Sequence, residues 1–392
     1  MRIGIFSDSY YPHISGVSTS VEMLRKALES MGHSVYIVAP NLDNRKFIYD
    51  KDNKVIYLPG IKIGLYKLRL AETYSRKAMK IIKDEWHLDI IHTQTEFTTS
   101  HFGRTVARKL HLPVVHTYHT MYEDYVYYIT HGHFEKFAKK MVVKIVSNYC
   151  NNKCDALIVP TEKIKNLFKT YNIKKEINVI PTGIDLDRFY PTKTLTKKCD
   201  DLRKKLKINK DDFVIGAVGR IASEKSFDRI INNLPELVKY NNKIKLVLVG
   251  DGPEMDNLKE LAKKLNLKKN IIFTGLVDYD IVPIYYQLFD VMVSFSTTET
   301  QGLTIIEALA ASIPVVCIDD PSFNTTITSG YNGYLFTKDE EYLKYILDLA
   351  YNKTLYKEMS MNAHNSVYSY SKEVFASNVL KVYHDVIKKN KS

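Results

Sequence analysis

The sequence predicts an α/β protein with two doubly wound domains, each a parallel sheet with helices on both faces. One observation is that short β-branched runs alternate with helical patterns along the whole chain. A second is that this alternation stops near residues 182–210, where glycine, proline and lysine-rich stretches intervene, and then starts again. The third is length, because 392 residues exceed what one hydrophobic core usually serves.

Six apolar runs in the first half have the length and composition of buried parallel strands. They cover residues 2–7, 34–39, 89–92, 113–117, 155–159 and 177–180. Between the first two lies an amphipathic helix that ends at Gly32, with its apolar face formed by Val21, Leu24, Ala27, Leu28 and Met31. We therefore expect a first domain over residues 1–190.

Five further runs predict the sheet of a second domain over residues 191–370. They cover residues 213–218, 245–249, 271–274, 290–295 and 314–318. One more amphipathic helix follows over residues 371–389. Ligands of doubly wound sheets bind beyond the carboxyl ends of the strands, so we expect the chemistry in a cleft between the two facing domains.

The formal charge of +12 is unevenly placed, with 28 Lys and Arg against 19 Asp and Glu in residues 1–190, and 28 against 25 in the rest. A basic first half favours nucleic acid or acidic lipid as partner, although a solubilising surface explains net charge equally well. The sequence has no aromatic ribonucleoprotein motif, zinc finger or recognition-helix pattern. We therefore expect no nucleic-acid partner.

The cysteines and the apolar stretches predict a cytoplasmic protein that does not cross a membrane. Cys150, Cys154, Cys199 and Cys317 form neither a disulfide-like framework nor a zinc spacing, which indicates reduced thiols. The start of the chain resembles a strand rather than a signal peptide, and no apolar stretch is long enough to span a bilayer.

Two carboxylates, Glu299 and Glu307, flank Gly302 and the start of an apolar helix expected over residues 303–311. A helix N-terminus presents unpaired N–H groups and partial positive charge, which suit an anion. About eighty residues earlier, Arg220 and Lys225 follow a predicted strand. Cations and N–H groups between two carboxylates match a ligand with phosphates in the middle and hydroxyls at both ends, as in a nucleotide-sugar.

These segments, with Gly16 after the first strand and the turn at residues 250–253, resemble the family 4 retaining glycosyltransferases of the GT-B fold. The resemblance runs from the first strand to the last helix. Residues 116–125 and 298–304, including Gln301 where many relatives carry an aromatic residue, are most similar to the bacterial diacylglycerol glucosyltransferases. The resemblance to this family implies two facing Rossmann-like domains. The first domain binds the acceptor and includes the returning helix of residues 371–392, and the second binds the nucleotide-sugar.

For the donor, the resemblance implies that Arg220 and Lys225 hold the diphosphate, where negative charge grows on the leaving oxygen. It assigns the ribose hydroxyls to Glu307 and the hydroxyls of the donor sugar to Glu299. The remaining donor-binding residues are expected where backbone approaches phosphate, at Gly16, Gly302 and Leu303.

For the reacting sugar, the resemblance indicates a histidine that follows the strand of residues 113–117. His119 fits this position, and His116, three residues earlier, is the alternative. A neutral imidazole there can donate to a sugar hydroxyl or stabilise the anomeric centre. Glu123 and Asp124 are candidates for contact with the acceptor hydroxyl, or are part of a solvated loop.

No metal or other cofactor is expected. Asp-x-Asp sequences at residues 185–187 and 278–280 match a metal-binding pattern of other glycosyltransferases. The first lies in the interdomain connector, and the cations Arg220 and Lys225 already supply positive charge, so a divalent ion is unnecessary.

Two basic segments of the first domain predict contact with an anionic membrane surface. Residues 62–83 carry seven basic residues and one acid, and residues 136–153 carry five lysines and no acid. Phe134, Phe137, Met141 and Ile145 recur at helical spacing in and before the second, as in a basic amphipathic helix at a lipid interface. An ordinary surface helix is the alternative. The candidate acceptor and membrane residues are Lys67, Arg69, Lys136, Lys139 and Lys140.

The sequence is therefore interpreted as a hexosyltransferase that moves glucose from UDP-glucose onto diacylglycerol, peripherally attached to the inner face of the cell membrane. One alternative is the same chemistry on a soluble or polyprenyl-linked acceptor. Another is a sugar-nucleotide enzyme resembling a UDP-sugar 2-epimerase, which would turn over donor without acceptor.

Overall fold

The computed structural model describes the chain apart from residues 14, 42–45, 63–68, 121–134 and 392. The chain divides into two compact units, one formed by Met1–Ile184 with Ser371–Ser392 and the other by Asp185–Tyr370. The division falls shortly before residue 190, and residues 185–190 belong to the second unit, where the side chain of Gln287 donates to the carbonyl of Phe189 at 2.8 Å.

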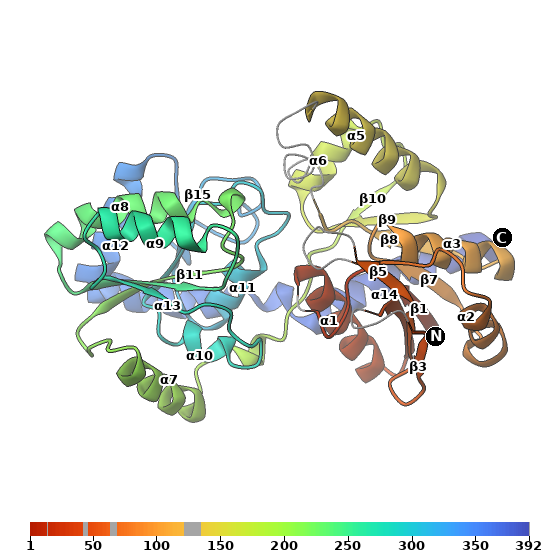
Figure 1. The fold of residues 1–392 in the computed structure, drawn as a ribbon, viewed down its shortest axis with the longest axis horizontal. Helices are drawn as coiled ribbons and strands as arrows, with labels where there is room; N and C mark the ends of the chain where they lie inside the picture. The colour runs from red at the N-terminus through yellow and green to blue at the C-terminus, as the bar shows by residue number, and fades with distance from the viewer. Residues whose placement is uncertain (14, 42–45, 63–68, 121–134, 392) are drawn as a thin grey trace. The chain divides into compact units, whose positions relative to one another are not determined.

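The first unit contains an eight-stranded sheet of order β10-β9-β8-β7-β1-β2-β4-β3, parallel except for the edge strand β3 (Figure 1). Its strands are β1 (Arg2–Phe6), β2 (Ser34–Pro40), β3 (Ile48–Asp50), β4 (Val55–Leu58), β7 (Ile90–Thr93), β8 (Val114–Thr117), β9 (Ala156–Val159) and β10 (Ile177–Val179). The six strands predicted for this half are present with ends within one residue of those expected. β3 and β4 are additional.

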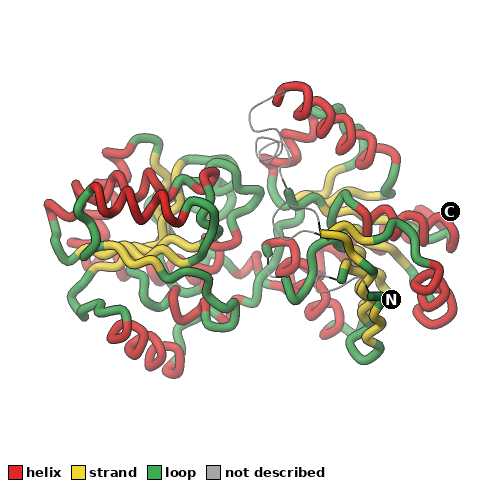
Figure 2. The backbone as a smooth tube through the Cα atoms, viewed as in Figure 1, coloured by secondary structure: helices red, strands yellow, loops and turns green. Residues whose placement is uncertain are grey.

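Helices cover both faces of this sheet, as Figure 2 shows. Side chains of β2 alternate between two cores: Val35 and Ile37 pack with α1 (Gly16–Ser30) and α14 (Lys372–Lys391), whereas Tyr36 and Val38 pack with α3 (Thr98–Leu110) and its neighbours. The other helices are α2 (Arg76–Ile81), the π-helix η1 (Ile82–Trp86), α5 (Glu135–Asn152) and α6 (Glu162–Thr170). This alternation makes the sheet doubly wound.

The C-terminal helix α14 returns to the first unit, as the resemblance implies. Phe375, Val379 and Tyr383 are buried in the same core as β1 and α1. The backbone of Gly183 passes close to the start of α14, since a Cβ on this glycine would lie 2.6 Å from the carbonyl oxygen of Ser371. A larger residue at Gly183 would therefore push α14 away.

The second unit contains a six-stranded, fully parallel sheet of order β13-β12-β11-β14-β15-β16. Its strands are β11 (Phe213–Val218), β12 (Ile244–Val249), β13 (Ile271–Phe273), β14 (Val291–Ser294), β15 (Val315–Ile318) and β16 (Gly333–Phe336). Its helices are α7 (Lys193–Lys205), α8 (Phe227–Tyr240), α9 (Met255–Lys264), α10 (Val282–Tyr286), α11 (Leu303–Ala310), α12 (Asp339–Tyr351) and α13 (Lys353–Asn365), with 3-10 turns η2 (Leu186–Arg188), η3 (Ser223–Lys225) and η4 (Tyr368–Tyr370). Five strands were predicted, and β16 is additional.

The basic stretch of residues 62–83 contains parts of two kinds of secondary structure. β5 (Gly60–Lys62) and β6 (Arg69–Ala71) form a separate antiparallel pair, and α2 begins only after Ser75, whose hydroxyl caps it. Hairpin pairing and an N-cap in mid-segment therefore divide this stretch. Within the described ranges, no helix has the length and hydrophobicity needed to cross a membrane.

Candidate active site

Two loops of the second unit bring the predicted donor-binding residues to one edge of its sheet. β11 and β14 are parallel neighbours, so the segments that follow them leave the sheet at the same edge. Arg220 and Lys225 follow β11, and Glu299 follows β14 before α11 begins. The hydroxyl of Thr298 donates to the carbonyl of Glu224 at 3.4 Å and ties the two loops together.

The two predicted cations of this site form ion pairs within the unit. Nζ of Lys225 lies 2.5 Å from Oε1 of Glu299, and the guanidinium of Arg220 pairs with the carboxylate of Glu224. The Lys225 and Arg220 side chains retain 24% and 31% of their exposure, whereas Glu224 retains only 8%. The cations thus remain accessible to a negatively charged ligand that competes with these carboxylates.

Gly302 gives α11 its N-terminus at this edge. Its φ of +79° is left-handed, and a Cβ at this position would lie 2.6 Å from the Phe323 ring, so both backbone and packing require glycine. No side chain caps α11, and the N–H of Ile305 donates to the carbonyl of Gly302 at 3.0 Å, so the N–H groups of Leu303 and Thr304 form the part of this N-terminus suited to an anion.

Glu307 lies one turn into α11 and is buried. Burial raises the pKa of its carboxyl to about 7, while a hydrogen bond from Tyr286 and the charge of Arg188 act in the opposite direction. The Tyr286 hydroxyl donates to Oε2 of Glu307 at 2.7 Å, which leaves the carboxylate with unused acceptor capacity. Sequence reasoning missed both Tyr286 and Arg188, because neither residue belongs to a motif that predicts contact with Glu307.

The Asp-x-Asp sequence at residues 278–280 contributes a structural contact. Oδ1 of Asp280 lies 3.3 Å from Nη2 of Arg188, and the guanidinium of Arg188 stacks on the Tyr279 ring with its Cζ 4.0 Å from the ring centroid. Arg188 also donates to the carbonyl of Tyr279. These contacts fix Arg188, whose charge acts on Glu307.

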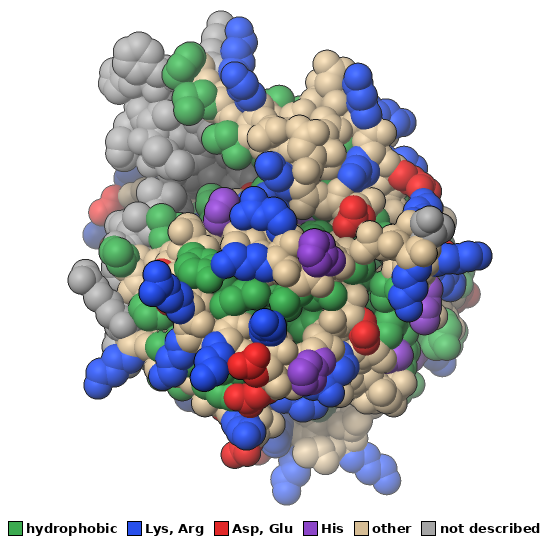
Figure 3. Space-filling model, turned by 90° about the vertical axis from the view of Figure 1, so that its right-hand side faces the viewer, with side chains coloured by type: hydrophobic (Ala, Val, Ile, Leu, Met, Phe, Trp, Pro, Cys, Tyr) green, Lys and Arg blue, Asp and Glu red, His purple; other side chains and the backbone are tan. Residues whose placement is uncertain are grey.

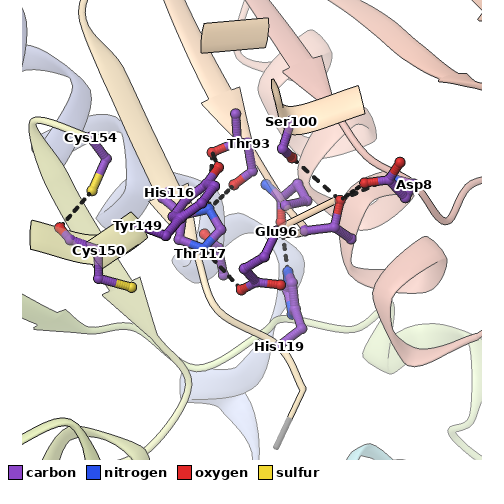
Figure 4. A network of polar contacts seen from close by, with 12 residues as sticks. Asp8, Thr93, Glu96, Ser100, His116, Thr117, His119, Tyr149, Cys150 and Cys154 are labelled. Carbon is purple, nitrogen blue, oxygen red and sulfur yellow. Dashed lines mark hydrogen bonds and ion pairs between the residues drawn. The ribbon is translucent and has the colours of Figure 1, made fainter. Parts of the chain in front are cut away.

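In the first unit, the predicted histidines belong to a polar cluster at the carboxyl ends of β7 and β8 (Figure 4). His116 is fully buried within β8, with Nε2 3.0 Å from Oε1 of Glu96 and Nδ1 2.9 Å from the hydroxyl of Thr93. The ring of Tyr149, from α5, packs 4.5 Å from that of His116. Both nitrogens of His116 are thus used in structural contacts.

His119 lies two residues beyond β8 and is only half-buried. Its Nε2 contacts Oε1 of Gln94 at 2.6 Å. Burial, and to a lesser degree His116, lower the pKa of His119 to about 3, so its ring is neutral at physiological pH. Of the two candidate histidines, His119 is the one with an available ring nitrogen.

The residues that organise this cluster were missed by sequence reasoning. Asp8 is buried after β1 and accepts hydrogen bonds from the hydroxyls of Thr95 at 2.6 Å and Thr98 at 2.8 Å. Gln94 and Glu96 directly follow β7. The available signal was the polar run of residues 93–96 at the end of a predicted strand.

Gly16 is the first residue of α1 and is exposed. It directly follows the N-cap Ser15, whose side chain accepts from the N–H of Ser18 while the Ser18 side chain accepts from the N–H of Ser15. Gly16 therefore lies at a helix N-terminus in the first unit, and its predicted role in phosphate binding stays a prediction.

Several predicted acceptor and membrane residues lie outside the described part of the chain: Lys67, Glu123 and Asp124, and the side chains of Arg69 and Lys136. Lys139 and Lys140 lie on α5, where Lys140 is exposed. The apolar residues Phe137, Met141 and Ile145 of α5 are 65%, 49% and 56% exposed. They do not face the core of the unit, which α5 contacts through another face, where Val146, Tyr149 and Cys150 are buried.

Comparison with known proteins gives matches over both units. Residues 14–188 match the model of Glycosyltransferase Family 4, and residues 199–366 match that of Glycosyl transferases group 1. The alpha-monoglucosyldiacylglycerol synthase of Acholeplasma laidlawii is 38% identical over 100% of this chain and 98% of its own length. The protein of the same name from Streptococcus pneumoniae (strain ATCC BAA-255 / R6) is 36% identical over 100% of this chain and 87% of its own.

Solved structures share the fold. HepE of Anabaena, crystallised in complex with UDP-glucose, superimposes with a TM-score of 0.75 at 17% identity, covering 98% of this chain and 99% of that one. Sucrose-phosphate synthase from Thermosynechococcus elongatus gives a TM-score of 0.75 at 20% identity, covering 99% of each chain.

Proposed function

This chain belongs to glycosyltransferase family 4 and has the GT-B fold, and on that premise we propose that it transfers glucose from UDP-glucose onto a hydroxyl of diacylglycerol, with retention at the anomeric carbon. The observation that carries the proposal is the 38% and 36% identity over the whole chain to two alpha-monoglucosyldiacylglycerol synthases. Likeness over the entire length includes both the half expected to bind the acceptor and the half expected to bind the donor.

In the proposed donor complex, the diphosphate takes the place of the carboxylates that now contact Arg220 and Lys225. The accessibility of both cations supports this exchange. Glu299, released from Lys225, then accepts hydrogen bonds from hydroxyls of the glucose. The first N–H groups of α11, after Gly302, complete the phosphate site.

Glu307 is proposed to accept hydrogen bonds from the ribose hydroxyls of the nucleotide. Its buried position one turn into α11, with Tyr286 already bound to one oxygen, supports this role. A carboxylate with free acceptor positions can take a pair of hydroxyls at once.

The proposed reaction needs no divalent ion. As the bond between the anomeric carbon and the diphosphate breaks, Arg220 and Lys225 stabilise the negative charge on the departing oxygen. The acceptor hydroxyl forms the new bond on the same face of the sugar, and its proton passes to the departing diphosphate. Each fixed donor of this kind typically contributes about 3 kcal/mol to stabilising the transition state.

We further propose that the protein attaches peripherally to an anionic membrane surface on the cytoplasmic side, through α5. The exposed apolar residues Phe137, Met141 and Ile145 and the exposed Lys140 on this helix support the proposal. Figure 3 shows one face of the molecule, on which Lys and Arg side chains are widely spread and cover more of the surface than Asp and Glu. Each such cation near an anionic lipid surface contributes about 1 kcal/mol.

The test is a panel of nucleotide-sugars incubated with vesicles that contain diacylglycerol, followed by mass spectrometry of the extracted lipid. We expect a monohexosyl lipid from UDP-glucose. If no donor yields a glycolipid, the proposal is wrong. Transfer to a water-soluble acceptor instead would favour a glycosyltransferase that acts on soluble acceptors. Turnover of the nucleotide-sugar without any acceptor would favour an enzyme resembling a UDP-sugar 2-epimerase.

A further inference from the structure

A chain of buried polar contacts leads from the C-terminal helix to His119 in the first unit. The Tyr383 hydroxyl, on α14, lies 2.6 Å from Nδ1 of His92, and Nε2 of His92 lies 2.7 Å from the Thr117 hydroxyl. Gln94 lies between His92 and His119, and it is almost fully buried, as are His92 and Tyr383. The only member of this chain with appreciable exposure is therefore His119, at its end.

The contacts of Gln94 determine which way its amide points. Nε2 of Gln94 lies 3.2 Å from Nδ1 and 3.1 Å from Nε2 of His92. An atom so nearly equidistant from both nitrogens in the plane of the ring would clash with the carbon between them, so it lies over the ring face. That face is electron-rich and attracts an N–H group, whereas it repels a carbonyl oxygen. The amide oxygen of Gln94 therefore points to His119.

An amide oxygen only accepts hydrogen bonds, so its partner must supply the hydrogen. At 2.6 Å, Nε2 of His119 must carry a proton and donate to Oε1 of Gln94. A neutral imidazole has one N–H, so Nδ1 of His119 keeps a lone pair. Among the residues that the structure describes, Nδ1 has no hydrogen-bond partner.

We propose that Gln94 is a positioning residue that holds His119 in the tautomer protonated on Nε2, so that Nδ1 accepts a hydrogen bond from a hydroxyl of the bound sugar substrate. The identity of that hydroxyl as part of a sugar rests on the proposed function, whereas the tautomer does not. His119 thus acts as an acceptor and cannot donate a hydrogen bond from Nδ1 while it is neutral. Of the two roles that the sequence left open for His119, this tautomer excludes donation from Nδ1 to a sugar hydroxyl.

The first test observes the tautomer directly and needs no substrate. The full chain is labelled with 15N-histidine, and two-bond proton–nitrogen correlation spectra are recorded at neutral pH. The signals of His119 are assigned from their loss in His119→Asn. We expect the pattern of a ring protonated on Nε2. A ring protonated on Nδ1, or an averaged mixture of the two forms, overturns the proposal.

The second test changes the partner. Gln94→Met removes the acceptor at nearly constant volume, and we expect a mixture of tautomers with kcat lower by about 10-fold to 100-fold, the usual loss when a partner that orients a functional imidazole is removed. The KM for the nucleotide-sugar should change much less, by a factor of about three or below. Gln94→Glu keeps an acceptor for His119 and should keep the Nε2–H pattern, while it should lower stability because an oxygen replaces the N–H group over the His92 ring.

Asn270→Met serves as a matched control because Asn270 is another buried amide, whose nitrogen donates to the carbonyl of Ile244 at 2.9 Å in the second unit. It should lower stability but leave the His119 signals unchanged. If Gln94→Met retains the wild-type tautomer and kcat, the proposal is overturned. If Gln94→Met does not fold, the tautomer of His119 in the wild-type spectrum and in Gln94→Glu still tests the proposal. An Nε2–H ring in a protein that transfers no sugar would reject the proposed function and leave the role of Gln94 standing.

Discussion

Nζ of Lys225 lies 2.5 Å from Oε1 of Glu299, a contact that joins η3 to the loop before α11 across 74 residues of sequence. Two groups proposed for different parts of the donor thus neutralise each other within the second unit. In the proposed donor complex, a diphosphate that takes over the lysine would release the carboxylate for the sugar. We therefore expect binding of the two ends of the donor to be coupled through this pair.

Lys225→Ala should reduce kcat about 100-fold to 1000-fold, the usual loss when one fixed donor to a developing negative charge is removed. The measurement is steady-state transfer of glucose to diacylglycerol vesicles. Lys239→Ala is the matched control, because Lys239 also lies 2.5 Å from a carboxylate, that of Glu236, but on the exposed surface of α8. Equal activity of Lys225→Ala and the control would remove Lys225 from the site.

Glu307 should make the affinity for donor depend on pH near neutrality. Its pKa is raised to about 7, and only the ionised carboxylate accepts two ribose hydroxyls. We expect the KM for UDP-glucose to fall as pH rises from 6 to 8. His119, with a pKa lowered to about 3, is neutral throughout this range. Glu307→Gln should remove the dependence, and a profile unchanged by that substitution would contradict the role of Glu307.

The same raised pKa has the opposite effect on stability. The folded carboxyl of Glu307 binds a proton more tightly than the unfolded one, whose pKa is 4.5. Between these values the folded state holds more protons, so its stability decreases as pH rises from 4.5 to 7, by up to roughly 3 kcal/mol. Denaturant unfolding of the wild type and Glu307→Gln at pH 5 and pH 7 checks this. The difference in stability between the two pH values should be smaller in the variant.

Removal of two buried tyrosine hydroxyls should have opposite effects on the free energy of unfolding. The Tyr383 hydroxyl contacts Nδ1 of His92 at 2.6 Å, whereas the buried Tyr342 hydroxyl has no hydrogen-bond partner in the described structure. Tyr383→Phe leaves a buried ring nitrogen unpaired and should cost about 1–3 kcal/mol of unfolding free energy. Tyr342→Phe removes an unsatisfied group and should be neutral or stabilising. Equal losses in both variants would show that the His92 contact adds nothing to stability.

Buried, repetitive elements of this chain could be predicted from sequence, and paired or irregular ones could not. β1 and β11 are continuous apolar runs, which buried parallel strands favour. β3, β5 and β6 have three residues each and depend on antiparallel pairing with a neighbour, which no local pattern encodes. The parallel edge strand β16 is likewise only four residues long.

Residues of the candidate site could be predicted where they belong to a sequence motif, and not where their role depends on contacts distant in sequence. Glu299, Glu307, Arg220 and Lys225 were predicted because they belong to motifs with fixed spacing. Gln94, Asp8 and Tyr286 were missed because their importance comes from contacts between residues distant in sequence. Asp8, for example, meets Thr95 across 87 residues.

The exposed face of α5 provides the last prediction. Phe137, Met141 and Ile145 are exposed to 65%, 49% and 56%, and they recur at a spacing that places them on one side of the helix. If this face inserts at a lipid interface, the triple substitution to serine removes apolar burial of about 1.5 kcal/mol or more per residue. Binding to vesicles of anionic lipid, measured by sedimentation, should weaken at least about 1000-fold. The free energy of unfolding should change little, because none of the three is buried. Tyr351 and Met361 in the second unit are 61% and 54% exposed and offer a control, since their substitution to serine should leave vesicle binding intact. If the α5 variant still sediments with vesicles as the wild type does, the membrane contact lies elsewhere on the protein.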